Sequence, residues 1–347
     1  KRFDLYSKKW YALPKFLSVQ KEIKISFGLL KDGFKIFKDS LNLRGERKKI
    51  RELAAIESLS LNSHFSIRMF YFTKKIMDQI EPEYIFTTYE GHSWERLVYA
   101  AAKFKNKNVK NIGYQHALIF SKQHALRRSL ADQFNPDFIL TSGRVGKSIL
   151  EKSKILSKER IINFGSPRTD VNIIEKNSFQ PNKDSVLFLP EGDYKECELM
   201  IDLAFELSAH HKTTNYIVRF HPLISVGKLE ERYKKSLLLN ENVRFSISTL
   251  EKDLDESNYV IYRGTTTVIK AIEHGLYPIY FSLRNEMSIN PLHDIDIDII
   301  FNNLDFSKII LKNEKIKKSK LKKIQKHATG FFSPLNYREA LKIKTIQ

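Results

Sequence analysis

Short apolar segments alternate with helical segments through most of this chain, and this alternation constrains the fold more than any other feature of the sequence. Strands are predicted at 84–88, 111–115, 138–141 and 160–164, with a helix at 94–104 between the first two. Alternating strands and helices are typical of a parallel sheet that is covered by helices. The first series therefore predicts an α/β domain.

A second series of the same kind follows the first. Its predicted strands are 186–189, 216–220, 243–246, 259–262 and 278–281, and its predicted helices are 196–210 and 267–274. The polar stretch 172–184, which contains Pro181, is predicted to link the two series. We therefore expect an α/β protein with two Rossmann-like domains that face each other across a cleft.

The chain has 347 residues, which supports two domains because one hydrophobic core rarely serves so long a chain. The predicted organisation is an N-terminal domain over 1–171, the linker 172–184, a C-terminal domain over 185–311 and a Lys-rich tail over 312–347. A surface helix is expected at 312–326 within that tail.

The start of the chain is expected to be helical and basic. Large apolar residues with spacings of three and four form one face of a predicted helix: Phe27, Leu30, Phe34, Phe37 and Leu41. Lysines occupy much of the remaining surface: Lys24, Lys31, Lys35 and Lys38. Amphipathic helices usually pack on their own domain, and this is the first interpretation. The alternative is contact with an anionic membrane surface.

The chain carries 59 basic and 40 acidic residues, a net charge of +19, which favours an anionic partner such as nucleic acid, a membrane or a phosphorylated substrate. No apolar run reaches the about 18 residues that span a bilayer, and no signal-peptide pattern is visible. A single cysteine, Cys197, excludes an internal disulfide framework and a Cys-rich zinc site. A cytoplasmic location is expected, and membrane contact would place the protein at the inner face of the cytoplasmic membrane.

Metal and cofactor motifs are not found. No Asp-x-Asp segment and no His/Cys cluster shows the spacing of metal ligands, so neither a metal nor a cofactor is predicted. The alternating Asp294, Asp296 and Asp298 are interpreted as one face of an edge strand. The segment 143–147 contains Gly and Lys but lacks the spacing of a phosphate-binding loop, which argues against an NTPase.

A glutamate follows the first predicted strand of each series. Since ligands of open α/β sheets bind at the carboxyl ends of the strands, these positions are candidates for a site. Glu90 precedes Gly91 and His92, and Glu191 precedes Gly192. Either carboxylate is suited to general acid or base catalysis. The alternatives are a helix N-terminal acid for Glu90 and plain turn chemistry for Glu191.

A basic pair ends the predicted strand 216–220. Arg219 and His221 are two residues apart, so a continuing strand would present both on one side, and Pro222 stiffens the exit. Arginine supplies a planar fork of donors, and histidine donates a hydrogen bond or a proton, so the pair suits a phosphate. A structural histidine is the alternative.

A glycine and three hydroxyls lie between a strand and the helix 267–274. The segment is Arg263, Gly264, Thr265, Thr266 and Thr267. Free N–H groups at a helix start, together with hydroxyls, form an anion site, whereas the alternative, an N-cap, needs one hydroxyl and not three. We expect this segment to bind a phosphate.

Weaker candidates are expected on the acceptor side. Gln115 and His116 end the strand 111–115, and Arg168 lies in a turn at the end of the first domain. They are grouped with Gly91 and His92 as acceptor-side residues.

Taken in order, these motifs resemble those of bacterial glycosyltransferases of the GT-B class. The segment from Arg263 to Glu273, with a strand on either side, resembles the donor-binding half of that class. The Glu-Gly and His-Pro elements resemble those of bacterial sialyltransferases and Kdo transferases, which use CMP-activated 2-keto sugar acids. The resemblance covers about residues 84–282.

The resemblance implies roles for individual residues. Glu90 would be the acid/base on the acceptor side, and His221 would contact the CMP phosphate. Thr265 and Thr266 would match a paired hydroxyl motif near the donor. In retaining Kdo transferases a carboxylate of the second domain can be the nucleophile, and Glu191 could match it, so the assignment of the carboxylate stays open between Glu90 and Glu191.

The expected activity is a metal-independent glycosyl transfer in the synthesis of a bacterial surface polysaccharide, either lipopolysaccharide O-antigen or capsule. The donor would be CMP-Kdo or a CMP-nonulosonate, and the acceptor a hydroxyl of a lipid-linked glycan or an oligosaccharide. Without a metal motif, Arg219, His221 and the helix start at Thr265 would stabilise the leaving phosphate.

Two other functions are compatible with the sequence. A transferase of polyol phosphate from a CDP-linked donor would have a similar second domain. A basic nucleic-acid-binding protein would fit the charge, but no nucleic-acid motif is found and the lysines gather at the two ends of the chain, so no nucleic acid is expected as a partner.

Overall fold

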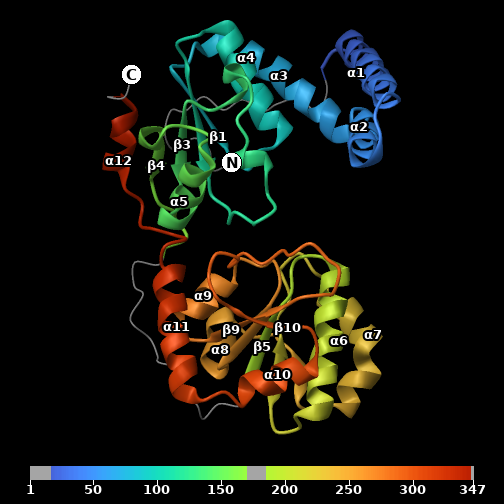
Figure 1. Ribbon diagram of the computed structural model, residues 1–347, viewed down its shortest axis with the longest axis vertical. Helices are drawn as coiled ribbons and strands as arrows, with labels where there is room; N and C mark the ends of the chain where they lie inside the picture. The colour runs from blue at the N-terminus through green and yellow to red at the C-terminus, as the bar shows by residue number, and fades with distance from the viewer. Residues whose placement is uncertain (1–16, 170–184, 345–347) are drawn as a thin grey trace, which may run out of the picture. The chain divides into compact units, whose positions relative to one another are not determined.

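The computed structural model describes residues 17–169 and 185–344 (Figure 1). The predicted linker 172–184 and the predicted boundary at residue 171 lie outside the described residues. The chain divides into two compact units, Lys1–Tyr114 with Ala125–Ile139 and Gln115–His124 with Leu140–Gln347.

Helices and strands alternate as the sequence predicts. The α-helices are α1 (Val19–Ser40), α2 (Gly45–Glu57), α3 (Leu61–Ile80), α4 (Ser93–Lys105), α5 (Arg144–Ser153), α6 (Tyr194–His210), α7 (Val226–Leu239), α8 (Leu250–Glu256), α9 (Val268–Glu273), α10 (Asn303–Ile310), α11 (Glu314–Ala328) and α12 (Tyr337–Leu341). The strands are β1 (Tyr84–Thr88), β2 (Lys110–Gln115), β3 (Phe138–Thr141), β4 (Ile161–Asn163), β5 (Ser185–Leu189), β6 (Asn215–Val218), β7 (Val243–Phe245), β8 (Tyr259–Tyr262), β9 (Tyr277–Phe281) and β10 (Asp298–Ile300). No helix of the described residues is both long and apolar enough to cross a membrane.

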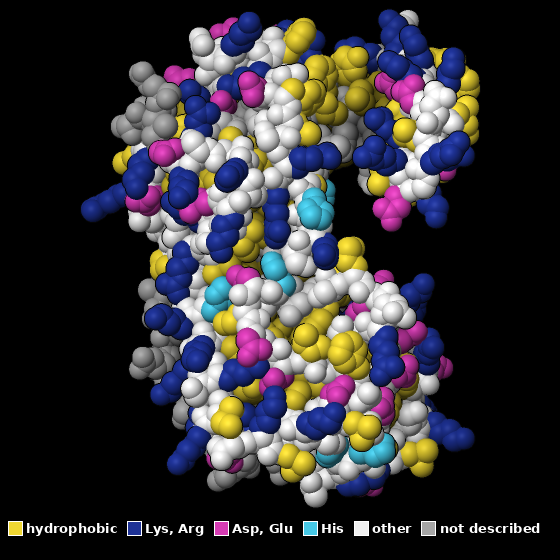
Figure 2. Space-filling model, in the orientation of Figure 1, with side chains coloured by type: hydrophobic (Ala, Val, Ile, Leu, Met, Phe, Trp, Pro, Cys, Tyr) yellow, Lys and Arg dark blue, Asp and Glu magenta, His cyan; other side chains and the backbone are white. Residues whose placement is uncertain are grey.

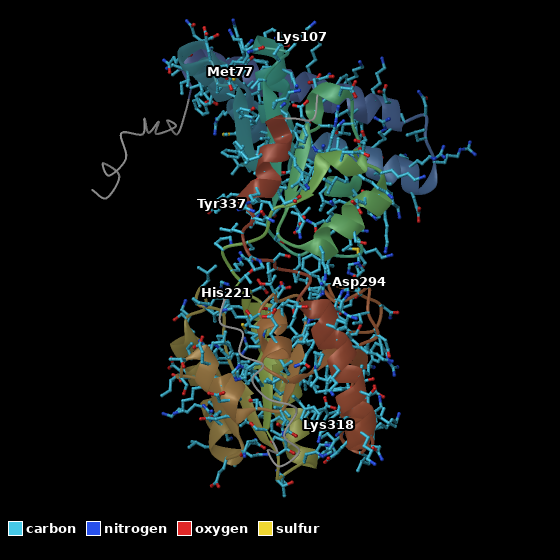
Figure 3. The ribbon with its side chains drawn as sticks, turned by 90° about the vertical axis from the view of Figure 1, so that its left-hand side faces the viewer. Met77, Lys107, His221, Asp294, Lys318 and Tyr337 are labelled. Carbon is cyan, nitrogen blue, oxygen red and sulfur yellow. The ribbon has the colours of Figure 1, made fainter. Side chains whose placement is uncertain are left out.

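The first unit begins with three helices, as the basic helical start predicts. Gly33 allows α1 to approach α2 closely, because a Cβ at this position would lie 2.4 Å from Ser58 Oγ. Glu22 of α1 accepts two hydrogen bonds from Arg68 Nε of α3, at 2.9 and 3.0 Å. Met77 of α3 is buried with Ala102 of α4 (Figure 3). The helices α1, α2 and α3 are therefore held together by packing and by a partly exposed ion pair.

The predicted packing of the apolar face of α1 on its own domain is wrong for the described part of the chain. Ile25, Gly33 and Ser40 are the buried residues of α1. The predicted face, from Phe27 to Leu41, instead lies at the surface, and its five large side chains are between 45% and 70% exposed. The helix has two apolar stripes, and the sequence pattern does not tell which of them packs.

The strands of the first series form one sheet of four in the order β1-β2-β3-β4. β1 and β2 are parallel, with Tyr84 opposite Lys110 and Thr88 opposite Tyr114. Asp137, just before β3, accepts a hydrogen bond from the backbone N–H of Asn111 in β2 at 2.7 Å. The parallel sheet predicted for the first series is confirmed.

The second unit contains a sheet of six strands in the order β10-β9-β8-β5-β6-β7, and its strand pairs are parallel. The chain enters at β5, in the middle of the sheet. It continues to one edge through β6 and β7, and then returns to fill the other half with β8, β9 and β10. The order thus reverses between β5 and β8, which is where open α/β sheets bind ligands.

The alternation of side chains along β5 explains its two-sided core. Val186 and Phe188 pack into a cluster with α6 and α7, whereas Leu187 and Leu189 pack into a second cluster with α9. Because successive strand residues point to opposite faces, a continuous apolar run is what a strand covered on both faces requires. Figure 1 shows α6 and α7 on one side of this sheet and α9 and α11 on the other. The predicted α/β fold with two parallel sheets is confirmed.

The helix predicted at 312–326 is present as α11, and it packs on the second unit. Leu321, Ile324 and Ala328 are buried. Asp298 at the start of the edge strand β10 accepts from Lys312 at 2.8 Å and from Lys320 at 2.9 Å. Asp298 is thus in an edge strand, as predicted, and it holds two of the C-terminal lysines. Asp294 and Asp296 precede β10, so the predicted strand face is wrong for these two residues.

The chain after α11 packs against the end of the first series within the same unit. Ser142 Oγ donates to the carbonyl of Phe331 at 3.1 Å, and the backbone N–H of Ser166 donates to Ser333. Gly165 has a φ of +97° and leaves room for Pro334, whose carbonyl oxygen would lie 2.2 Å from a Cβ there. Residues far apart in sequence therefore join in the second unit.

Candidate functional site

The carboxyl ends of β5, β6 and β8 carry the candidate site of the second unit. Glu191 follows β5, His221 follows β6 and Gly264 follows β8. These three strands are neighbours in the sheet, and the strand order reverses between β5 and β8. The structure therefore brings together three residues that the sequence places 30 and 43 positions apart.

The carboxylate of Glu191 lies directly against the backbone of Gly264. A Cβ added at position 264 would be 1.3 Å from Glu191 Oε1, which no side chain could tolerate without moving the carboxylate. Gly264 is buried, whereas Glu191 is only partly exposed. Glycine at 264 is thus needed for a close approach. Both residues are candidates from the sequence, but no sequence pattern indicates that they are in contact.

The environment of Glu191 favours its protonated form. Burial is the main cause that raises its pKa, and the negative charges of Glu196 and Asp193 add to it. The positive charge of Arg263 acts in the opposite direction and is outweighed. A carboxyl group with a raised pKa at the carboxyl ends of parallel strands is a candidate for acid–base or nucleophilic chemistry.

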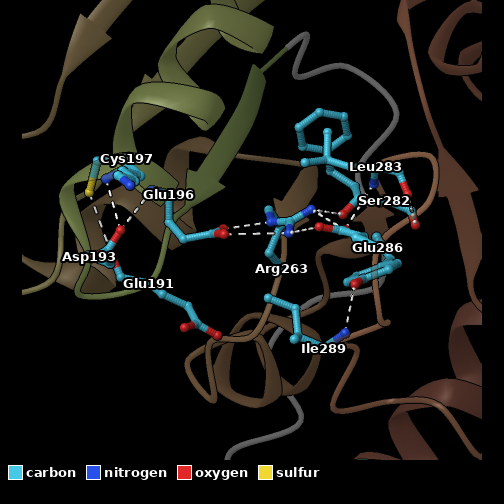
Figure 4. A network of polar contacts seen from close by, with 12 residues as sticks. Glu191, Asp193, Glu196, Cys197, Arg263, Ser282, Leu283, Glu286 and Ile289 are labelled. Atoms are coloured by element: carbon cyan, nitrogen blue, oxygen red, sulfur yellow. Dashed lines mark hydrogen bonds and ion pairs between the residues drawn. The ribbon is translucent and has the colours of Figure 1, made fainter. Parts of the chain in front are cut away.

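Arg263 is the centre of a buried ion network (Figure 4). Its guanidinium, 2% exposed, contacts Glu196 at 2.6 Å and Glu286 at 2.8 Å through each of two nitrogens, and donates to the carbonyl of Phe281 at 3.1 Å. Burial alone would lower the pKa of Arg263, but the hydrogen bonds that it donates to the two carboxylates raise it above its ordinary value. The same pairing lowers the pKa of Glu286, against the effect of its burial.

The network gives Arg263 a role other than the direct phosphate contact expected from the sequence. Its donors are directed to α6, through Glu196, and to the loop after β9, through Glu286. Arg263, which directly precedes Gly264, therefore connects the end of β8 to α6 and to the loop after β9. Glu196 and Glu286 were missed by the sequence analysis, and no local pattern signals a pair 67 or 23 residues away.

His221, which is labelled in Figure 3, lies beside Gly192, the residue after Glu191. A Cβ at position 192 would be 3.2 Å from His221 Nδ1. That nitrogen accepts from the backbone N–H of Leu223 at 3.2 Å, which leaves Nε2 to carry the proton of the neutral ring. The carbonyl of His221 accepts from Ile224 in a turn whose second position is Pro222, the residue suited to it. The turn thus orients an exposed imidazole donor.

Arg219 does not share the direction of His221. β6 ends at Val218, two residues before the predicted strand end, so the expected strand alternation does not apply to this pair. Arg219 instead donates to Asp253 and to the carbonyl of Ser248, each at 2.8 Å. Since Asp253 is fully buried, Arg219 braces the start of α8.

The hydroxyl segment lies at the start of α9. Thr265, Thr266 and Thr267 are each partly exposed, and Thr265 Oγ accepts from the backbone N–H of Thr267 at 3.3 Å. This hydrogen bond closes a local turn before α9 and is not the N-cap of the alternative interpretation, because the N-cap residue Thr267 makes no capping hydrogen bond with its side chain. Glu273 is the last residue of α9, at the end of the helix remote from Gly264, so the structure does not bring it to the other donor-side residues.

In the first unit, Glu95 organises the loop that carries Glu90. The Glu95 carboxylate is fully buried and accepts from the backbone N–H groups of Glu90, Gly91 and His92 at about 3 Å and from Thr88 Oγ at 2.9 Å. Burial raises the pKa of Glu95 despite these hydrogen bonds. The signal that could have found Glu95 is its place three residues after the helix N-cap, where a capping carboxylate belongs.

Glu90 and His92 interact within that loop. His92 Nε2 lies 3.2 Å from Glu90 Oε2. Gly91 between them has a φ of +86°, and a Cβ there would lie 2.4 Å from the backbone nitrogen of Leu126. The loop therefore requires glycine at this position and holds Glu90 near an imidazole.

The predicted acceptor-side residues are divided between the two units. Gln115 is buried against Gly146 at the start of α5, since its Oε1 would lie 2.3 Å from a Cβ there. His116 follows it and is partly buried. Arg168 is exposed, and its guanidinium lies 5.8 Å from the centre of the Phe332 ring. Gln115, His116 and Arg168 belong to the second unit, and Gly91 and His92 to the first.

A surface hollow of about 500 Å³ lies elsewhere in the second unit. It is lined by Ser185 and Asn215, which start β5 and β6, and by charged residues such as Glu241 and Arg244. The hollow therefore opens at the amino ends of these strands, whereas Glu191 lies at their carboxyl ends. Among the described residues, no group of three or more His, Cys, Asp and Glu side chains is arranged to hold a metal ion.

Neither a protein-family model nor a curated protein matches this sequence. Solved structures do match in part. TarM is 13% identical with a TM-score of 0.48, over 76% of this chain and 55% of TarM. The UDP-GlcNAc 2-epimerase of Methanocaldococcus jannaschii, in complex with UDP-GlcNAc and UDP, is 12% identical with a TM-score of 0.45, over 77% and 82%. The lipopolysaccharide outer core galactosyltransferase WaaB is 11% identical with a TM-score of 0.46, over 82% and 81%.

Proposed function

We propose that this chain is a glycosyltransferase of bacterial surface-polysaccharide synthesis. In this proposal it transfers a 2-keto sugar acid, Kdo or a nonulosonate, from a CMP-activated donor to a hydroxyl of a lipid-linked or oligosaccharide acceptor in the cytoplasm. The observation that carries it is the contact of the Glu191 carboxylate with Gly264, together with the contact of Gly192 with His221, at the reversal of strand order. The choice of CMP rests on the resemblance of the Glu-Gly and His-Pro elements.

The chemistry requires stabilisation of a leaving phosphate. The bond between the anomeric carbon and the CMP phosphate oxygen breaks, and its electron pair goes to the phosphate. Nε2 of His221 is the donor that the Leu223 hydrogen bond sets up, so it would contact that phosphate and donate a hydrogen bond or the proton. Exposed N–H groups and hydroxyls at Thr265 and Thr266 would add neutral donors.

Glu191 is proposed as the nucleophile of a retaining reaction. Its carboxylate oxygen would form a bond to the anomeric carbon as the phosphate leaves, and the acceptor hydroxyl would then displace it while losing its proton to a base. By the resemblance to Kdo transferases and sialyltransferases, Glu90 would be that base. Only the ionised carboxylate attacks, so the raised pKa of Glu191 predicts that the acid limb of activity lies above the ordinary pKa of a glutamate.

Donor binding and turnover test this proposal. Calorimetry should detect CMP binding by the wild type and weaker binding by His221→Ala. Incubation with CMP-Kdo or a CMP-nonulosonate should release CMP in excess EDTA, since no divalent metal is proposed. Binding of CDP-glycerol without CMP-sugar turnover would favour a polyol-phosphate transferase, and no binding of either nucleotide would reject the proposal.

A further inference from the structure

The α1–α2 pair exposes many large apolar side chains that the proposed function does not use. In α1, Phe27, Leu30, Phe34, Phe37 and Leu41 are 45–70% exposed, and in α2, Ile50, Leu53 and Ile56 are 64–69% exposed. Figure 2 shows hydrophobic side chains on the outer edge of this helix pair among Lys and Arg side chains. So many large apolar groups on one surface are unusual for a face that stays in water. We call these eight residues the hairpin stripe.

The hairpin stripe is not the face that holds the helices together. The buried residues of α1 are Ile25, Gly33 and Ser40, and that of α2 is Ala55. Gly33 packs on Ser58, and Glu22 binds Arg68 of α3. The two helices are thus anchored without the stripe, so its exposure does not depend on an unfinished fold of the pair.

Lysines border the stripe along α1. Lys31, Lys35 and Lys38 each follow a stripe residue by one position, which places them about 100° further round the helix. All three are exposed. α1 has five lysines against three acidic residues, and α2 has four basic against three acidic residues. An apolar stripe flanked by lysines is the pattern of a helix that lies in the interface of an anionic bilayer.

We propose that the hairpin stripe inserts into the surface of an anionic lipid bilayer, with Lys31, Lys35 and Lys38 contacting the headgroups. A second copy of this chain fits less well, because two such helix pairs would bring their lysines together in a protein of net charge +19. The residues before α1 fit less well for the same reason, since 1–16 contain five basic residues and one acidic residue. The proposal is independent of the proposed function.

Vesicle flotation with the full chain tests the proposal. Two sets of vesicles are compared, phosphatidylcholine alone and phosphatidylcholine with phosphatidylglycerol. The wild type should float only with the anionic vesicles, and added salt should weaken the binding because the Lys contacts are screened. Failure to float with either set would overturn the proposal.

Two variants of the helix pair separate its apolar and charged contributions. Phe27→Glu with Phe34→Glu places charge in the stripe and should abolish flotation. Lys31→Gln, Lys35→Gln and Lys38→Gln together should weaken binding by at least about tenfold, because each lysine near an anionic surface contributes about fivefold. Since all five positions are exposed, both variants should melt at the wild-type temperature.

Matched controls use exposed residues of the second unit. Leu238→Glu with Leu311→Glu changes two apolar side chains that are 73% and 84% exposed. Lys315→Gln, Lys322→Gln and Lys323→Gln removes three exposed lysines of α11. Both controls should bind as the wild type does. Equal loss in the controls, or wild-type binding by the hairpin variants, would contradict the proposal. So would a dimer in light scattering that only the Phe27→Glu, Phe34→Glu variant dissociates, because a second copy would then cover the stripe.

Discussion

Two glycines leave room for side chains of the candidate site. Gly264 admits the Glu191 carboxylate, and Gly192 admits the His221 ring. Both contacts depend on the absence of a Cβ and not on an unusual φ, since neither residue is among the glycines with positive φ. A sequence shows such a glycine, but not which side chain occupies the space that it leaves.

Gly264→Ala should separate activity from stability. The added Cβ meets the end of the Glu191 side chain and not backbone, so the fold can persist while the carboxylate is displaced. A displacement of about 1 Å costs about 10²-fold in rate, and we expect a loss of this size in CMP release. Gly227→Ala in α7 is the control, because a Cβ there meets nothing within 4 Å.

The control should be neutral or more stable than the wild type by about 0.5–1 kcal/mol, because alanine is the better helix former. Chemical denaturation of both variants measures this. If Gly264→Ala kept wild-type turnover, the position of the Glu191 carboxylate against Gly264 would not matter for catalysis.

His221→Ala should lower turnover by about 10²–10³-fold, the cost of removing one preorganised donor. The ring is exposed, so the melting temperature should hardly change. Steady-state rates with a CMP-sugar and a thermal melt provide the two measurements. A folded variant with undiminished turnover would exclude the phosphate role of His221.

At the scale of elements, the period of the apolar residues predicted most of what is found. The strands of both series occur within a few residues of their predicted positions, because buried parallel strands need continuous apolar runs. The helices α5, α7, α8, α10 and α12 were not predicted. α7 buries only Leu229 and Tyr233 of its 14 residues, so its periodicity is weak.

The packing partner of a helix is harder to infer than the helix itself. The spacing of Phe27, Leu30 and Phe34 predicted an apolar face correctly, and the assumption that it packs on its own domain failed. The network around Arg263 was equally hidden, since its partners Glu196 and Glu286 lie in other elements. Local spacing carries no information about contacts made by tertiary folding.

Arg263→Lys should destabilise the second unit. Lysine cannot reproduce the paired nitrogens that bind Glu286 and the further contact with Glu196, so we expect a loss of about 1–3 kcal/mol in the free energy of unfolding. Urea denaturation at neutral pH measures it. An equally stable lysine variant would show that one point charge satisfies both carboxylates.

The stability difference between the wild type and Arg263→Lys should depend on pH. The pKa of Glu286 is lowered in the folded protein, so its pairing contributes stability above the ordinary pKa of glutamate, 4.5. That contribution is lost as the pH falls below 4.5 and through the lowered value. The difference between wild type and Arg263→Lys should therefore be full at neutral pH and shrink in acid. A difference that grew in acid would contradict this assignment.

At the scale of the whole molecule, a glutamate follows the first strand of each series. Glu90 Oε2 lies 3.2 Å from His92 Nε2, and Glu191 contacts Gly264 and is followed by Gly192, which packs against His221. The sequence identified both carboxylates, yet it could not rank them, because each follows a strand and neighbours a glycine. The structure distinguishes them by environment: burial and nearby carboxylates raise the pKa of Glu191.

Paired substitutions of the two carboxylates should therefore reveal the course of the reaction. If Glu90 alone acts as the base, the product is inverted, and Glu90→Gln is far more damaging than Glu191→Gln. If Glu191 is the nucleophile, both substitutions are severe, and Glu90→Gln should trap a sugar on the protein because the second step lacks its base. We expect the second outcome, since the seat on Gly264 holds Glu191 in one place for attack.

Intact-protein mass spectrometry after incubation with the CMP-sugar detects the trapped adduct, and digestion should locate it at Glu191. Adding a small nucleophile such as azide to Glu191→Gln or Glu191→Ala provides the matched experiment, because azide can replace a missing carboxylate at the anomeric carbon. The stereochemistry of the product by NMR is an independent measurement. Retention of configuration requires two displacements and therefore a nucleophile, whereas an inverted product from a fully active Glu191→Gln enzyme would leave Glu191 no covalent role.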